Sequence, residues 1–334
     1  MPEKWLIAIP PEGAARTVGL EVAAAFSAIV SLDNCKIFDS KTYFLAYSSM
    51  LKSPDETMVV DLLNQTLVVQ CLEFRATNVL VLALSPVTLF TLNLLKSNNI
   101  QTVHWFYEDF RRASYWKDVI AGYCRFFAIQ KGPVANECAR LGVPYSFLPT
   151  AAGQKSLSEE SKNAPISADA SFVGLPSSYR VRVLEYLSSQ GISLSIAGQG
   201  WDRYRGCLEP SIVRTTWTDA RESAAILENS LIGLNLSMSD PQSDRENTHI
   251  SPRVFDVMLM GRVLVTENVP LVHEVLPDCA YYCFSDEFEA AQIIKEILFH
   301  PKKQLENIEK NSRAVEAGHL YKHRVKKILE IMGK

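Results

Sequence analysis

Short apolar runs alternate with longer helical patterns along both halves of this chain, and this alternation restricts its fold more than any other feature. Each run is apolar at nearly every position rather than at every second one, which is typical of strands buried on both faces of a parallel sheet. The helical patterns between the runs predict the crossover helices that parallel strands require. In the first half we predict strands at 5–9, 79–84, 102–106, 126–129 and 145–148, and helices near 14–30, 56–74, 87–97 and 133–141.

The alternation stops and then restarts, which predicts two domains. Residues 151–168 are rich in Ser, Glu, Lys and Ala and lack periodicity, as a linker does. We therefore assign 1–150 to an N-terminal domain, 169–318 to a C-terminal domain, and 319–334 to a helix that can pack back on the first domain. In the second half we predict strands at 170–173, 194–197, 232–236 and 263–266, helices near 178–189, 220–229, 252–260 and from 286, and one or two terminal helices within 301–332.

The composition argues against several classes of function. With 34 basic and 37 acidic residues the net charge is −3, and the basic residues are spread along the chain, so we expect no binding of nucleic acid. Seven cysteines without C-x-x-C spacing predict reduced, mostly buried thiols. The apolar run at 5–9 is too short for a secretory signal, and polar residues such as Ser85 and Pro86 divide the uncharged stretch 79–95. We therefore expect a cytoplasmic protein without an integral membrane segment.

Residues 251–261 predict a short helix with defined ends, because they read Ser-Pro-Arg-Val-Phe-Asp-Val-Met-Leu-Met-Gly. Ser251 suits the N-cap, Pro252 the first turn and Gly261 a left-handed stop. The apolar residues share one face of this helix, and Arg253 and Asp256 share the other. A helix N-terminus with an arginine fits phosphate, and a carboxylate one turn later can accept hydrogen bonds from ribose hydroxyls. A surface ion pair between these two residues is the alternative.

Other candidate ligand-binding residues follow predicted strands of the second half, where doubly wound folds bind ligands. They are Gly174, Gly198, Gly200, Trp201 and Asn235, followed by the loop with His249. The glycines would allow a ligand close to the backbone, or they only form turns. Arg203 occupies the third glycine position of a dinucleotide-binding fingerprint, so Gly198 and Gly200 do not complete one. Because the sequence has no Asp-x-Asp motif, we expect Arg180, Arg253 and the helix dipole, rather than a metal ion, to neutralise a diphosphate.

In the first half, the predicted strand 102–106 leads into Glu108 and Asp109. A carboxylate at this place can orient or deprotonate an acceptor hydroxyl. The alternative is that these acids cap the next helix or pair with Arg111 and Arg112.

The segment from Ser251 to Glu274 resembles the CgeB-like (spore maturation protein type) glycosyltransferases, which show a Ser-Leu-Arg-Val-Phe-Glu-Ala-Met-Ala-x-Gly pattern here. The resemblance covers most of the chain, because it extends to Phe172-Val-Gly, Gly198-x-Gly-Trp, Ile232-Gly-Leu-Asn, His104-Trp-Phe-Tyr-Glu-Asp, Leu148-Pro-Thr-Ala-Ala and Tyr321-Lys-His-Arg. It implies the GT-B arrangement, in which two Rossmann-like, doubly wound α/β domains face each other across a cleft. The second domain would hold a nucleotide-sugar donor and the first an acceptor. Related retaining enzymes place a glutamate on the donor ribose at the position of Asp256, and some have an acid at the position of Thr248.

We therefore expect a metal-independent, retaining glycosyltransferase that moves a sugar from a nucleoside-diphosphate donor to a glycan, protein or small-molecule acceptor, without another cofactor. Two alternatives remain. One is an inactive homologue that binds sugar nucleotides or glycans, because Asp256 is shorter than glutamate and Thr248 is not acidic; the other is a nucleotide-sugar epimerase. The predicted catalytic residues are Glu108, Asp109, Arg180 and Arg253, and the predicted donor-binding residues are Gly174, Gly198, Gly200, Trp201, Asn235, His249, Ser251, Arg253 and Asp256.

Overall fold

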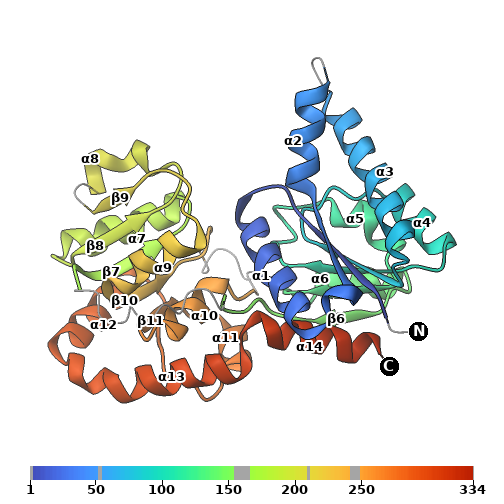
Figure 1. The fold of residues 1–334 in the computed structure, drawn as a ribbon. Helices are drawn as coiled ribbons and strands as arrows, with labels where there is room; N and C mark the ends of the chain where they lie inside the picture. Colours follow the sequence, from blue (N-terminus) through green and yellow to red (C-terminus); the bar gives the residue numbers. More distant parts are fainter. Residues whose placement is uncertain (1–2, 52–54, 154–165, 209–210, 241–248, 334) are drawn as a thin grey trace. The chain divides into compact units, whose positions relative to one another are not determined.

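The computed structural model describes residues 3–51, 55–153, 166–208, 211–240 and 249–333, and the chain forms two compact units (Figure 1). Unit 1 comprises Met1–Thr150 and Tyr321–Lys334, and unit 2 comprises Ala151–Leu320. Each unit contains one six-stranded sheet with flanking helices, and neighbouring strands in both sheets are parallel. The prediction that each half of the chain forms a parallel sheet with flanking helices is confirmed. Most of the predicted linker lies outside the described residues.

The sheet of unit 1 has the strand order β2-β1-β3-β4-β5-β6. Every residue of β1 and β3 is buried, as their continuous apolar sequences predict. The strands are β1 (Trp5–Ile9), β2 (Cys35–Asp39), β3 (Asn78–Leu82), β4 (Gln101–Phe106), β5 (Arg125–Ala128) and β6 (Tyr145–Phe147). The helices are α1 (Gly13–Ile29), α2 (Ser40–Met50), α3 (Glu56–Phe74), α4 (Leu89–Ser97), α5 (Trp116–Val119), α6 (Pro133–Arg140) and α14 (Tyr321–Met332).

The last helix, α14, belongs to unit 1 and lies against α1 (Figure 1). Its residue Arg324 is buried, and Nε donates to the carbonyl oxygens of Pro149 at 2.9 Å and Thr150 at 3.1 Å. Burial lowers the pKa of Arg324 to about 10, so the guanidinium is still charged at neutral pH. These hydrogen bonds therefore fix the segment around Thr150, where the first part of unit 1 ends, to helix α14.

The sheet of unit 2 has the strand order β12-β11-β10-β7-β8-β9. The strands are β7 (Ala168–Val173), β8 (Leu194–Ala197), β9 (Ile212–Arg214), β10 (Ser230–Asn235), β11 (Val263–Glu267) and β12 (Tyr282–Phe284). Numbered within the unit, this is the doubly wound order 3-2-1-4-5-6, which reverses between β7 and β10. The helices are α7 (Ser178–Ser189), α8 (Arg205–Leu208), α9 (Ala220–Glu228), α10 (Pro252–Leu259), α11 (Pro270–Val275), α12 (Glu287–Phe299) and α13 (Leu305–Gly318).

The prediction for helix α10 is confirmed at both ends. The hydroxyl of Ser251 accepts the N–H of Arg253 at 3.3 Å, and Gly261 adopts a left-handed φ of 67°. Gly233 of β10 lets the helix lie directly on the sheet, because a Cβ there would come 2.3 Å from Cγ2 of Val257. The buried face of α10 is thereby held against the strand that ends at Asn235.

Several elements differ from the sequence prediction. Strand β3 ends at Leu82, whereas we expected it to continue through Leu84, whose φ of 64° does not fit a strand. Strands β2, β9 and β12 were not predicted; all three lie at sheet edges, where fewer positions are buried. Helix α2 was also not predicted, and it buries only Ser40.

The seven cysteines form no disulfide, but, contrary to the prediction, most of them are not buried. All seven cysteines are free; Cys35, Cys71 and Cys138 are buried, whereas Cys207 is exposed. Within the described part of the chain, no helix combines the length and the apolar sequence that crossing a membrane requires.

Candidate functional site

Arg253 bridges the two strands between which the strand order of unit 2 reverses. Its Nε donates to the carbonyl oxygen of Val173 in β7 at 2.9 Å, and Nη1 donates to Oδ1 of Asn235, the last residue of β10, at 3.0 Å. The guanidinium carbon lies 4.7 Å from the centroid of the Phe172 ring. Doubly wound sheets bind ligands at this reversal point. Arg253 therefore lies where a ligand is expected to bind in this fold.

The charge of Arg253 is stabilised by neutral groups. Burial lowers its pKa to about 10, and the charges of Asp256 and Glu267 act in the opposite direction. Arg253 is therefore still a cation at neutral pH, and it forms no ion pair with any residue that the structure describes. Among the described residues, the guanidinium is hydrogen-bonded by a carbonyl and an amide oxygen and contacts a ring face, without a paired carboxylate, so it is well suited to bind an anion.

Gly174 and Gly198 are required by the packing around Arg253. A Cβ on Gly174 would lie 2.9 Å from Nη2 of Arg253. Gly198 has a φ of 141°, and a Cβ there would lie 2.2 Å from the carbonyl oxygen of Gly174. The protein's own backbone and guanidinium thus occupy the space that these glycines leave, and a ligand is not needed to explain them.

Gly200 and Trp201 support the same loop. Gly200 has a left-handed φ of 94°, and its N–H donates to the carbonyl oxygen of Thr215 at 3.2 Å. Trp201 is fully buried, and its indole N–H donates to the carbonyl oxygen of Gly174 at 2.7 Å. We predicted that Trp201 would contact a donor. It instead lies in the core, where its hydrogen bond fixes the backbone of Gly174.

Arg180 has a different environment from Arg253, although we predicted the same role for both. It is buried, and its guanidinium carbon lies 5.1 Å from the centroid of the Phe172 ring. Nε donates to the carbonyl oxygen of Ser237 at 2.9 Å, Nη2 to that of Leu236 at 2.7 Å, and Nη1 to that of Leu175 at 2.7 Å. These bonds hold the loop that follows β10, so Arg180 fixes the loop rather than presenting a free guanidinium edge.

Asp256, His249 and Ser251 belong to the segment around α10. Oδ1 of Asp256 accepts the N–H of Gly153 at 3.3 Å, so this carboxylate contacts the segment that enters unit 2. Ser251 caps the helix, and His249 is partly buried two residues earlier. Thr248 lies outside the described residues.

Glu267, at the end of β11, contacts the same loop as Arg180 and was not predicted as a site residue. It is 1% exposed, and Oε1 accepts the N–H of Ser237 at 2.7 Å. Burial raises the pKa of its carboxyl. The sequence signal was an acid directly after the strand predicted at 263–266, because a charged residue at this point marks the carboxyl end of a buried strand.

The two acids of unit 1 are not equivalent. Asp109 forms a two-point ion pair with Arg111, with Nε–Oδ1 at 2.9 Å and Nη2–Oδ2 at 2.6 Å, which is one of the alternatives we had left open. The Glu108 carboxylate has no hydrogen bond within the described residues, and burial raises its pKa. Of the two, Glu108 therefore has the environment that suits proton transfer.

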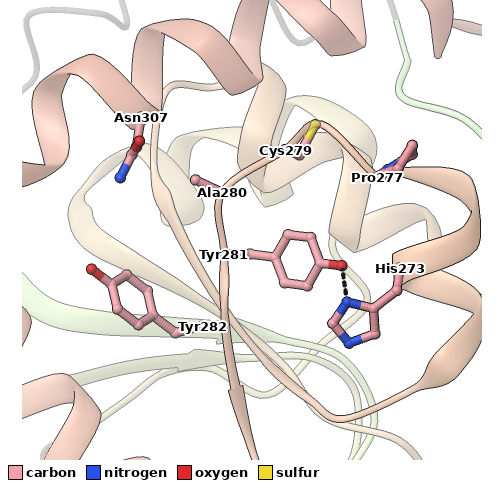
Figure 2. A pocket seen from close by; sticks show the side chains of 7 residues that line it. All are labelled: His273, Pro277, Cys279, Ala280, Tyr281, Tyr282 and Asn307. Carbon is pink, nitrogen blue, oxygen red and sulfur yellow. Dashed lines mark hydrogen bonds between the residues drawn. The ribbon is translucent and has the colours of Figure 1, made fainter.

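Figure 2 shows a cavity of about 500 Å³ on unit 2 that contains none of these residues. The hydroxyl of Tyr281 lies 2.7 Å from Nδ1 of His273. Among the residues that the structure describes, no acidic, lysine or arginine side chain lines the cavity, and none of the candidate donor-binding residues does. Its lining consists of His273, Pro277, Cys279, Ala280, Tyr281, Tyr282 and Asn307.

Comparisons with known proteins concern both the fold and the second unit. Residues 180–330 match the model of the family described as "Glycosyl transferase-like". No curated protein matches the sequence significantly. Sucrose-phosphate synthase from Thermosynechococcus elongatus is similar at a TM-score of 0.67 and 11% identity, over 99% of this chain and 98% of that one. HepE from Anabaena, in complex with UDP-glucose, is similar at 0.66 and 10%, over 99% and 100%.

The chain has the GT-B fold. UDP-GlcNAc 2-epimerase from Neisseria meningitidis, bound to UDP-GlcNAc, has a similar fold at a TM-score of 0.56 and 10% identity, over 98% of this chain and 99% of that one. At these identities the GT-B fold is shared, and the chemistry must be argued from the site itself. The family match includes α10 with Arg253 and Asp256, and it extends through Glu267.

Proposed function

We propose that this chain is a glycosyltransferase. It takes a sugar from a nucleoside-diphosphate donor bound in unit 2 and transfers it to the hydroxyl of an acceptor that unit 1 binds. The observation that carries the proposal is Arg253, a cation without an ion-pair partner in the described structure, between the carboxyl ends of β7 and β10. The match of residues 180–330 to a glycosyltransferase-like family supports it, as do the UDP-sugar complexes of GT-B proteins such as HepE.

The donor diphosphate would bind Nη2 of Arg253 at the N-terminus of α10. The chain would need no metal ion for this step, because a guanidinium and a helix N-terminus together supply positive potential to the leaving group. Asp256 would accept hydrogen bonds from the donor ribose. Arg180 and Glu267 would fix the loop that follows β10, through Leu236 and Ser237.

On the acceptor side, Glu108 would take up the proton of the attacking hydroxyl. The bond that forms joins the acceptor oxygen to the anomeric carbon, and the bond that breaks joins that carbon to the diphosphate oxygen. The nucleoside diphosphate leaves with the electron pair of the broken bond. We include retention of the anomeric configuration in the proposal because of the family resemblance at Asp256. The acceptor oxygen would then attack from the same face of the sugar as the departing diphosphate.

A screen of nucleotide sugars tests the proposal directly. The protein is incubated with each donor, with and without EDTA, and the release of nucleoside diphosphate is measured along with the melting temperature. A donor at a hundred times its dissociation constant should stabilise the fold by about 2.7 kcal/mol. Stabilisation by at least one nucleotide sugar and slow release of its diphosphate in EDTA are expected. If no nucleotide sugar or nucleoside diphosphate stabilises the protein, the proposal is wrong.

A nucleotide-sugar epimerase is the second candidate, because proteins of similar fold include a UDP-GlcNAc 2-epimerase. An epimerase converts one sugar isomer into another, whereas a transferase attaches the sugar to an acceptor. Proton NMR of the donor sugar separates the two reactions. A binding protein without activity would show the stabilisation alone.

A further inference from the structure

Leu84 has a backbone conformation that leucine rarely adopts. The described residues other than glycine with a positive φ are Arg75 at 55°, Leu84 at 64° and Asn99 at 59°. Arg75 and Asn99 follow the ends of α3 and α4, where left-handed residues are common. Leu84 instead follows strand β3, and the left-handed region is unfavourable for its side chain.

A chain of hydrogen bonds holds Leu84 in this conformation. Its N–H donates to the hydroxyl oxygen of Tyr115 at 2.9 Å, and that oxygen lies 3.2 Å from Nε2 of His104. Nδ1 of His104 lies 2.8 Å from the carbonyl oxygen of Val81. A carbonyl oxygen can only accept, so Nδ1 carries the proton and Nε2 accepts the hydroxyl proton of Tyr115.

The chain of bonds does not change near neutral pH. His104 is fully buried, and this burial lowers its pKa to about 3. The imidazole is therefore neutral over the range in which the protein would work. A neutral histidine with one fixed tautomer gives Tyr115 a single orientation.

Leu84 lies at the carboxyl edge of the sheet, close to the candidate base. Strands β3 and β4 are neighbours, with Leu82 paired to Trp105, and β4 leads into Glu108. Burial raises the pKa of Tyr115, whose hydroxyl holds Leu84, and the nearby charge of Glu108 raises it further. Leu84 is 42% exposed. An apolar side chain is thus held at the surface, in an unfavourable conformation, beside the same tyrosine as Glu108.

We propose that Leu84 is a specificity residue that contacts an apolar part of the acceptor, and that His104 and Tyr115 position it. Strained residues persist where the surrounding structure enforces them, and they are concentrated at ligand-binding sites. A glycine at 84 would adopt the same backbone without strain, so folding alone does not require leucine there. The acceptor would then be an amphipathic molecule, such as a glycoside or alcohol with an alkyl or aromatic group. This inference rests on the proposed function.

The test compares two probes that differ only in their apolar part, methyl and hexyl β-D-glucopyranoside. Their affinities for the full chain are measured by ligand-observed NMR, without donor. The parent should bind the hexyl compound at least about ten-fold more tightly, the effect of burying two methylene groups. Leu84→Gly and Leu84→Asn should bring this ratio close to one without weakening the binding of the methyl compound. Tyr115→Phe should reduce the ratio, and Leu84→Met should keep it.

Asn99→Gly is the matched control, because it also replaces a left-handed residue with glycine but follows α4. It should keep the parental ratio. In Leu84→Gly the relief of strain opposes the loss of apolar contacts, so its melting temperature should stay close to that of the parent. Equal binding of both probes to the parent, an unchanged ratio in Leu84→Gly, or a ratio lost in Asn99→Gly would each overturn the inference. Binding of UDP to the same samples tests the proposed function separately, since it does not involve Leu84.

Discussion

Replacing Arg253 with alanine should weaken the binding of a nucleoside diphosphate far more than it destabilises the fold. A hydrogen bond between charged partners contributes about 1.5–3 kcal/mol, which corresponds to an increase in Kd of about ten- to 150-fold. UDP is the first nucleotide to test, because the similar HepE structure contains UDP-glucose. Calorimetry with UDP should therefore show an increase in Kd within this range for Arg253→Ala.

The effect on stability should be small because two contributions oppose each other. A pKa near 10 means that burial makes the charged arginine unfavourable for the fold, by an amount of the order of 3 kcal/mol at most. Alanine removes this cost, but it leaves Oδ1 of Asn235 and the carbonyl oxygen of Val173 without their donor, at about 1–3 kcal/mol each. At the middle of these ranges the net loss is about 1 kcal/mol, so the melting temperature should fall by about 2–4 °C, the shift that 1 kcal/mol causes in a domain of this size.

Arg253→Lys is the matched variant, because it keeps the positive charge and removes the planar fork. Its Kd for UDP should lie between those of the parent and Arg253→Ala. An unchanged Kd in Arg253→Ala would refute the reasoning and place the phosphate elsewhere. A large drop in the melting temperature, with normal UDP affinity in the fraction that stays folded, would mean that Arg253 is a structural residue.

Three further predictions concern the metal, the base and the packing of α10. Transfer should persist in EDTA, and an activity that magnesium or manganese restores after chelation would contradict the role given to Arg253. Glu108→Gln should lower single-turnover transfer by about 10²–10⁴-fold, whereas Asp109→Asn, whose parent carboxylate is bound by Arg111, should have a smaller effect. Because the pKa of Glu108 is raised, transfer should fall on acidification at a higher pH than an ordinary glutamate would cause, and Glu108→Gln should raise the melting temperature at pH 8 but not at low pH, where the parent carboxyl is protonated too. Gly233→Ala should cost about 1–3 kcal/mol of stability, because its Cβ would meet Val257, and Val257→Ala in the same chain should recover much of that loss in a urea titration.

The central strands could be predicted from the sequence, whereas most edge strands could not. Strands β1 and β3 are buried on both faces and appear as continuous apolar runs. Strand β2, in contrast, mixes buried and exposed positions, and β12 has only three residues. A strand at an edge is stabilised mainly by backbone hydrogen bonds to one neighbour, which leave no periodicity in the side chains.

The ends of α10 could be predicted because their causes are local. An N-cap hydroxyl and a left-handed glycine act on residues within one turn, so the sequence contains the whole signal. Leu84 shows the opposite case. Its apolar neighbours favoured a strand, but Tyr115, which is 31 positions later, holds it in a left-handed conformation.

Arg180 and Arg253 show why residue type and position after a strand did not suffice to predict which arginine binds a ligand. Arg180 and Arg253 both approach the Phe172 ring from segments near the carboxyl edge of β7. Their different roles depend on carbonyl groups in the loop that follows β10, more than 50 positions after Arg180. That loop must be fixed because the backbone after β10 leads toward the N-terminus of α10, and Glu267 holds the same loop from the neighbouring strand. If Arg180 acts only in this way, Arg180→Ala should impair UDP binding and lower the melting temperature together, whereas Arg253→Ala should impair UDP binding with only a small change in the melting temperature.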